Sequence, residues 1–262
     1  MTHMKFILIT ALTILVGSAF GQAVDGRQVV RAELITDAGD FTRPFTIGIQ
    51  FTLEPDWYLY WKNPGDSGLP IDVQWDLPAG WEVSELRHPV PSKFAHDNVV
   101  SYGYKNEVVL LATVTPGSEK VDVVKARLDW LVCQESCIRG NASVTLPLNA
   151  AAVDDTMRAS MVAAQGKFPV TMTVPLERAR VHETDYGWTA DVMFKGGTAT
   201  AITDFYPEET KDIMIDYGSI RIVDGALQFR FERQNQESGV VNVRGLFIAG
   251  EKGFEGTIPL HF

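Results

Sequence analysis

The sequence predicts an all-β protein of two immunoglobulin-like β-sandwich domains joined by a short helix. Short runs of β-branched and aromatic residues alternate along the chain with clusters of Gly, Pro, Asn and Asp, which is typical of strands separated by turns. The alternation is interrupted once, by the alanine-rich residues 150–166. A length of 262 residues, of which 45% are hydrophobic and 21% are charged, is enough for two globular domains.

The first predicted domain covers residues 22–149. Turns are expected at 63–68, 77–80 and 115–117, where Pro fixes φ and Gly permits a positive φ. Seven segments have the composition of strands: 29–35, 46–53, 58–61, 72–75, 108–114, 121–131 and 143–147. Seven short strands at this spacing favour an immunoglobulin-like sandwich.

A helical linker is predicted over residues 150–167. The alanines and methionines of 150–166 favour a helix of about four turns. Asn149 is a suitable residue to cap its start, and Gly166 is suitable to end it.

The second predicted domain, residues 168–262, is a smaller β-sandwich without cysteine. The pair Asp224-Gly225 predicts a tight hairpin turn within it. Eight strands are expected: 170–174, 179–183, 188–194, 213–216, 219–223, 226–232, 240–248 and 256–261.

The first 21 residues have the pattern of a secretory signal peptide. Lys5 precedes an apolar stretch over 6–16, and the small residues Ala19 and Gly21 fit a cleavage site near Gly21. The apolar stretch is shorter than the roughly 20 residues that span a bilayer, although an uncleaved anchor is the alternative interpretation. We therefore expect an exported, periplasmic protein with no membrane insertion of the mature chain.

Charge and motifs exclude several classes of function. The chain has 23 basic and 33 acidic residues, a net charge of −10, and no basic cluster, so we expect no nucleic-acid partner. It contains no Gly-rich phosphate loop after a strand, no Gly-x-Ser-x-Gly elbow and no His-Glu-x-x-His motif.

Cys133 and Cys137 are the two cysteines, separated by three residues at the end of a predicted strand. A hairpin or one helical turn would bring their sulfurs to bonding distance. Closing so short a loop stabilises a protein by only about 2 kcal/mol in the loop-entropy model. The spacing therefore leaves two interpretations open, a reversible dithiol/disulfide pair and a permanent structural disulfide.

Metal binding by the reduced pair is a third interpretation, with Cu(I) or Zn(II) as the ion. The five histidines are His3, His88, His96, His182 and His261, and none lies within a few residues of the cysteines as in a zinc motif. We therefore expect no bound metal and no cofactor other than the disulfide itself.

Four ordered motifs resemble the N-terminal periplasmic domain of the thiol:disulfide interchange protein DsbD, and they are most similar to its ScsB-like branch. They are residues 57–70, 77–81, 102–111, and 130–133 together with Cys137. The resemblance covers roughly residues 25–150 and implies an immunoglobulin-like redox domain. Family members that continue into a membrane domain and a thioredoxin-like domain contain their own electron donor. This chain has neither domain, so the resemblance implies a separate membrane donor of the DsbD or CcdA type and periplasmic thioredoxin-like oxidoreductases as acceptors.

The resemblance also implies roles for individual residues. Cys137 corresponds to the accessible cysteine that reacts with partners, and Cys133 to its resolving mate. Tyr58 and Tyr60 correspond to aromatic residues beside the disulfide, with a place in the sandwich core as the alternative.

Residues 94–99 correspond to a loop that caps the cysteines until a partner arrives. Phe94 would be the plug of this cap, and His96 or Asp97 a proton acceptor for a departing thiol. An ordinary exposed loop histidine is the alternative for His96.

The sequence thus predicts a thiol-disulfide exchange protein that relays electrons through Cys133-Cys137. Whether it counts as an enzyme is left open. The alternative is a non-redox periplasmic binding or interaction module in which the disulfide is structural.

Overall fold

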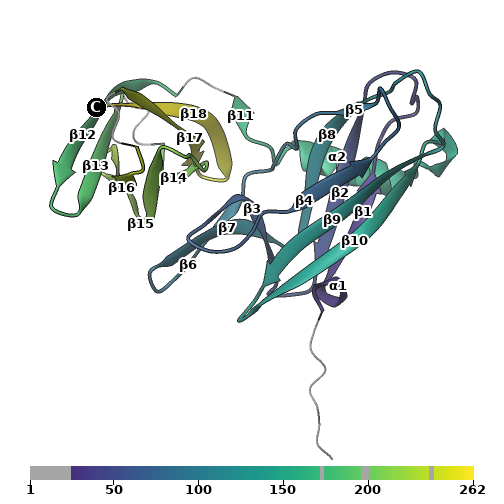
Figure 1. The fold of residues 1–262 in the computed structure, drawn as a ribbon, viewed down its shortest axis with the longest axis horizontal. Helices are drawn as coiled ribbons and strands as arrows, with labels where there is room; N and C mark the ends of the chain where they lie inside the picture. The colour runs from purple at the N-terminus through teal and green to yellow at the C-terminus, as the bar shows by residue number, and fades with distance from the viewer. Residues whose placement is uncertain (1–24, 172–173, 196–200, 236–238) are drawn as a thin grey trace, which may run out of the picture.

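The computed structural model describes residues 25–171, 174–195, 201–235 and 239–262, which form two β-sandwich domains connected by a helix (Figure 1). The expected signal peptide, residues 1–21, lies outside the described residues. Within the described part of the chain, no helix has the length and apolar character needed to cross a membrane.

Two sheets face each other in the first domain. One contains, in spatial order, β1 (Val30–Ile35), β2 (Phe45–Leu53), β8 (Glu107–Thr115) and β5 (Glu82–Val83). The other contains β10 (Cys137–Pro147), β9 (Val123–Cys133), β3 (Tyr58–Gly65), β7 (Val99–Lys105) and β6 (Ser92–His96), and β4 (Asp72–Asp76) also pairs with β9. The short helix α1 (Gly26–Val29) precedes β1 and is capped by Asp25.

Alternation along β2 and β3 builds the core of this domain. Ile47, Ile49 and Phe51 of β2 are fully buried, and burying side chains of this size stabilises the fold by about 1.5–3 kcal/mol each. Leu59 joins the same cluster from β3. Since successive side chains of a strand point to opposite faces, Tyr60 lies on the other face of β3 from Leu59.

The predicted linker helix is divided in two. Asn149 caps a short 3-10 helix, η1 (Ala150–Ala152), and Asp154 caps a separate helix, α2 (Asp155–Gln165). The first piece ends at Val153, whose backbone is extended, and Asp154 starts the second because its carboxylate accepts the Met157 N–H at 2.8 Å. Met161 of α2 packs on the first domain in a small cluster with Ile35, Val109 and Leu111.

The second domain repeats the two-sheet arrangement. One sheet contains β11 (Val170–Thr171), β18 (Lys252–His261), β17 (Val240–Ala249) and β14 (Asp204–Pro207). The other contains β12 (Leu176–Thr184), β13 (Gly187–Phe194), β16 (Ala226–Arg233) and β15 (Ile213–Val223). Phe205, Phe229, Phe231 and Phe247 form the centre of its core.

Several local expectations are corrected by the structure. The segments 213–216 and 219–223 are one strand, β15, whose pairing with β16 is irregular between Asp216 and Arg221. The expected turn 63–68 begins later, because β3 continues to Gly65. The Asp224-Gly225 turn is confirmed, with φ angles of 49° and 76° at its two central residues.

The two domains share an apolar contact surrounded by polar pairs. Tyr206, Leu246 and Ile248 of the second domain belong to the same buried cluster as the core of the first. Lys62 Nζ lies 2.6 Å from Glu208 Oε1, and Asn63 Nδ2 donates to the carbonyl oxygen of Pro207 at 2.7 Å.

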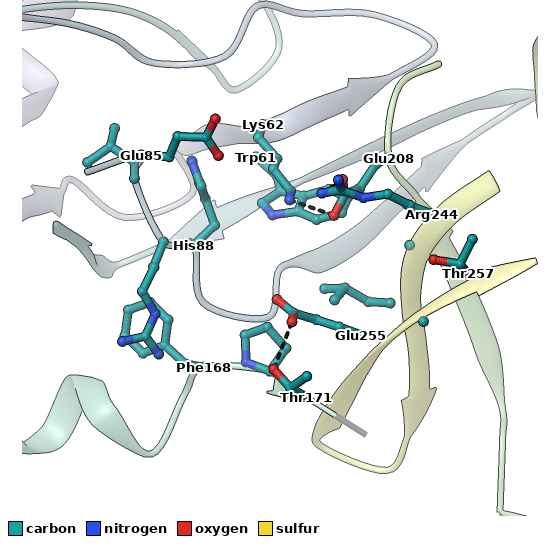
Figure 2. Close-up of a pocket in the computed structure, with 16 residues that line it drawn as sticks. Trp61, Lys62, Glu85, His88, Phe168, Thr171, Glu208, Arg244, Glu255 and Thr257 are labelled. Carbon is teal, nitrogen blue, oxygen red and sulfur yellow. Dashed lines mark hydrogen bonds and ion pairs between the residues drawn. The ribbon is translucent and has the colours of Figure 1, made fainter. Parts of the chain in front are cut away.

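A cavity of about 560 Å³ lies beside this contact, with residues of both domains in its wall (Figure 2). Figure 2 shows Lys62 and Arg244 meeting at the carboxylate of Glu208, and His88 facing the cavity from the first domain. Burial lowers the pKa of His88 to about 4, and the nearby positive charge of Lys62 adds to this effect.

Candidate redox site

A hairpin places the two cysteines opposite each other. β9 ends at Cys133 and β10 begins at Cys137, so that only Gln134, Glu135 and Ser136 form the loop. Within the loop, the N–H of Gln134 donates to the carbonyl oxygen of Ser136 at 3.2 Å. The Cα atoms of the cysteines are 4.1 Å apart and the sulfurs form a disulfide. Of the two local geometries that the spacing allowed, the hairpin is the one observed.

The two cysteines differ in their exposure to solvent. Cys133 is 1% exposed, whereas Cys137 is an exposed residue. The difference follows from the sheet order, because β10 is an edge strand and β9 has neighbours on both sides. A thiol from another protein can therefore approach Cys137 more readily than Cys133.

Two tyrosines of β3 lie beside the disulfide. Tyr58 pairs directly with Cys133 across the β3–β9 ladder, and Tyr60 follows on the same face of β3. The hydroxyl oxygen of Tyr60 lies 3.0 Å from Sγ of Cys133 and 3.5 Å from Sγ of Cys137. Because the sulfurs of a disulfide have no hydrogen to donate, the hydroxyl is the donor in both contacts.

The environment of Tyr60 keeps its hydroxyl protonated. Burial raises the pKa of Tyr60 well above its usual value of 10, and its hydrogen-bond contact and electrostatic interaction with the neighbouring Tyr58 raise it further. The tyrosine is 1% exposed. Tyr60 is therefore a permanent hydrogen-bond donor to sulfur at neutral pH, not a base.

The loop after β3 covers the ring of Tyr60. Gly68 has a φ of 114°, and a Cβ on this residue would overlap the Tyr60 ring. Ser67 also interacts with the Tyr60 hydroxyl and partly offsets the rise in its pKa. The sequence predicted only that these residues form a turn. Gly68 was the one signal that the backbone of this turn comes close to another group.

Phe94 lies in strand β6, so the expected cap loop is a β-hairpin made by β6 and β7. Its ring centroid is 4.8 Å from that of Tyr58, and Lys105 Nζ lies 5.1 Å from the Phe94 ring centre. Phe94 thus packs on Tyr58, while Cys137 remains exposed. Sequence reasoning did not select Lys105, which pairs with Tyr58 across the β3–β7 ladder.

His96 and Asp97 lie at the turn of the same hairpin. Their side chains are 96% and 87% exposed, with His96 Nε2 3.7 Å from Asp97 Oδ2. Asp97 has a φ of 53°, which the turn requires. Side chains this exposed are not packed against the sulfurs, so the structure brings Tyr58, Tyr60 and Phe94 to the disulfide region but leaves His96 and Asp97 in solvent.

Comparison with known families identifies the domain that carries this site. Residues 28–149 match the family described as thiol:disulfide interchange protein DsbD, N-terminal. The first domain belongs to the DsbD N-terminal family. Membership and the Cys133–Cys137 disulfide together support a role for this DsbD-type domain in thiol-disulfide exchange.

Solved structures extend the comparison to both domains. The N-terminal periplasmic domain of ScsB from Proteus mirabilis is similar with a TM-score of 0.65 and 17% sequence identity, covering 88% of this chain and 92% of that one. At this identity the similarity concerns the fold, including the second domain. The DsbD N-terminal domain of Neisseria meningitidis in the reduced form aligns with 48% of this chain and 90% of its own, with 13% identity and a TM-score of 0.34. No curated protein sequence matches the chain.

Among the described residues, no group of three or more His, Cys, Asp or Glu side chains is arranged to hold a metal ion. The groups that the site brings together are the two sulfurs and the hydroxyl of Tyr60.

Proposed function

We propose that this chain is an exported thiol-disulfide exchange protein that relays electrons from a membrane reductase of the DsbD or CcdA type to periplasmic thioredoxin-like oxidoreductases. The observation that carries the proposal is the asymmetry of the disulfide, with Cys137 exposed and Cys133 buried against the hydroxyl of Tyr60. A structural disulfide needs neither an exposed cysteine nor a buried hydrogen-bond donor beside the sulfur of the other one.

Reduction begins when a thiolate of the donor attacks Sγ of Cys137. The new bond is a mixed disulfide, the Cys133–Cys137 bond breaks, and its electron pair remains on Sγ of Cys133 as a thiolate. The Tyr60 hydroxyl, already 3.0 Å away, donates a hydrogen bond to this developing charge. The second thiolate of the donor then attacks the donor sulfur of the mixed disulfide and releases Cys137 as a thiolate.

The return half of the cycle uses the same residues in reverse order. The Cys137 thiolate attacks one sulfur of the acceptor's disulfide, which forms a second mixed disulfide and releases the other acceptor sulfur as a thiolate. The Cys133 thiolate then attacks Sγ of Cys137, which restores the internal disulfide and releases the acceptor as a dithiol. Two electrons pass in each cycle and no further cofactor is needed.

Export of the chain is part of the same proposal. Residues 1–21 have the pattern of a signal peptide, and the similar ScsB structure is described as a periplasmic domain. An oxidising compartment is also where a disulfide persists between uses.

Trapping of partners tests the relay. With Cys133→Ser, the mixed disulfide formed through Cys137 loses its resolving cysteine and persists longer, so we expect dithiothreitol-sensitive complexes on non-reducing gels of the exported fraction. Cys137→Ser is the matched control and should form few. Mass spectrometry of the complexes identifies the partners, and trapping that requires Cys133 instead would reverse the two roles.

The redox potential distinguishes the relay from the structural alternative. A potential below about −300 mV, with resistance to a thioredoxin, is the behaviour of a structural disulfide. We expect a higher value, in the range of catalytic dithiols, and a lower one would refute the relay.

A further inference from the structure

The β6–β7 hairpin has one face toward the disulfide region and one toward the second domain. Lys93 and Phe94 are neighbours on β6, so their side chains point to opposite faces of the strand. Phe94 packs on Tyr58, with ring centroids 4.8 Å apart. Lys93 Nζ lies 3.0 Å from Asp204 Oδ2 and 3.3 Å from Oδ1, at the start of β14 in the second domain.

The ion pair of Lys93 and Asp204 is shielded from solvent. The two side chains are only 22% and 23% exposed, so the pair is screened less than an exposed one. Asp204 is also fixed by its own strand, because its carboxylate accepts the backbone N–H of Phe205 at 2.8 Å. Lys93 is therefore held by a rigid partner.

The second strand of the hairpin is held as well. Tyr102, which pairs with Lys93 across the β6–β7 ladder, is fully buried, and its ring centroid lies 4.8 Å from that of Tyr206 and 6.0 Å from that of Tyr217. A Cβ on Gly218 of β15 would lie 3.7 Å from the carbonyl oxygen of Asn98, so the hairpin turn also reaches the second domain. Strands β14 and β15 thus contact both strands of the hairpin and its turn.

We propose that the second domain is a brace that holds the β6–β7 hairpin and thereby fixes Phe94 against Tyr58. Lys93 and Asp204 are positioning residues in this arrangement, since neither touches the sulfurs. The ordering of the residues beside the disulfide then depends on the contact between the domains. A redox partner that displaces β14 from the hairpin would loosen the cover next to the sulfurs while it binds. The suggestion that a redox partner releases the hairpin rests on the proposed function, whereas the contact that fixes Phe94 against Tyr58 does not.

Labelling of Phe94 and Tyr58 tests the geometry. We expect Lys93→Gln and Asp204→Asn each to raise hydroxyl-radical labelling of these two rings at least threefold, measured by mass spectrometry on the oxidised full chain. The double variant should resemble either single variant, because both remove the same ion pair. Lys93→Arg, which keeps the charge, should retain the wild-type labelling.

Lys62→Gln is the matched control. This variant also removes an ion pair between the domains, the one between Lys62 and Glu208. Lys62 lies in β3, however, and not in the β6–β7 hairpin. We expect labelling of Phe94 and Tyr58 to stay at the wild-type level in this variant. Unchanged labelling in the Lys93 and Asp204 variants, or an equal rise with Lys62→Gln, would overturn the brace.

The rate of reduction by a thioredoxin separates this inference from the function on which it rests. We expect the rate of reduction by a thioredoxin to rise several-fold in Lys93→Gln and Asp204→Asn. The rate with dithiothreitol should rise less, because this small molecule can reach the sulfurs without displacing the hairpin. A wild-type disulfide that a thioredoxin cannot reduce would count against the relay, whereas the labelling would still decide the brace. Equal rates in wild type and variants would show that the hairpin does not control access.

Discussion

The hydroxyl oxygen of Tyr60 lies 3.0 Å from Sγ of Cys133, although 73 residues separate the two in the chain. The β3–β9 ladder produces this contact by pairing Tyr58 with Cys133, which leaves Tyr60 on the same face of the neighbouring strand. The buried sulfur therefore has a donor ready before its bond to Cys137 breaks.

Tyr60→Phe should slow reduction of the disulfide. The change removes only the hydroxyl, and a hydrogen bond to a charged group contributes about 1.5–3 kcal/mol, which corresponds to a loss of roughly 10-fold or more in rate. Stopped-flow measurement with dithiothreitol gives the rate, and thiolate absorbance should show a raised pKa for the Cys133 thiol. Tyr58→Phe is the control, because the Tyr58 hydroxyl contacts Tyr60 and is one step removed from sulfur. Equal rates of reduction for wild type and Tyr60→Phe would show that the Tyr60 hydroxyl does not assist the reaction.

Gly68→Ala should destabilise the first domain more than Gly80→Ala. Both glycines have a positive φ, of 114° and 83°, and an L-residue in such a conformation costs about 1–2 kcal/mol. At Gly80 a Cβ would meet only the Cα of Gly117, at 3.9 Å, whereas at Gly68 it would overlap the ring of Tyr60. We expect at least about 1 kcal/mol of extra loss for Gly68→Ala in urea unfolding. Losses of equal size would mean that the loop does not press on Tyr60.

The parts of the site that the sequence could predict are those encoded locally. Cys133 and Cys137 lie close in the chain at the end of an alternating segment, and Tyr58 and Tyr60 are spaced by two, as residues on one face of a strand must be. Their proximity to one another was available only through the family resemblance. No local pattern determines which strands become neighbours in a sheet.

Strands β6 and β7 escaped sequence analysis for a physical reason. Five consecutive residues of β7, Val100 to Tyr104, are buried. Val100, Tyr102 and Tyr104 lie on one face, in a core cluster that also includes residues of the second domain, and Ser101 and Gly103 on the other face are buried as well. A strand buried on both faces does not alternate, and Ser101 and Gly103 weaken its apolar signal further. The contact of Lys93 with Asp204 spans 111 residues and has no signature in either segment.

Acid should destabilise the protein through His88 of the cavity between the domains. Its pKa is about 4 in the folded state and 6.5 when unfolded, so unfolding takes up a proton between these values. The free energy of unfolding should fall as the pH decreases from 7 to 5, a window in which most carboxylates stay ionised. His88→Gln should flatten this dependence in urea titrations, whereas His96→Gln, at a side chain that is 96% exposed, should not. The same slope in His88→Gln as in wild type would contradict the assignment.

Alkaline pH should destabilise the protein through its buried tyrosines. Burial raises the pKa above the usual value of 10 in Tyr60, Tyr102, Tyr104, Tyr206 and Tyr217. The unfolded chain therefore loses protons from pH 10 upward while the folded chain keeps them, and unfolding becomes more favourable as the pH rises.

Tyr104 is the most suitable of these tyrosines for a test, because it is buried in the core and donates to the carbonyl oxygen of Pro89 at 2.9 Å. Tyr104→Phe lowers stability at every pH by the loss of this hydrogen bond, about 1 kcal/mol. It should also reduce the slope of unfolding free energy against pH between 10 and 11, since one fewer proton is released. Tyr186→Phe, at a residue that is 89% exposed, provides the control with an unchanged slope. A slope that Tyr104→Phe leaves intact would mean that Tyr104 ionises in the folded protein as easily as in the unfolded chain.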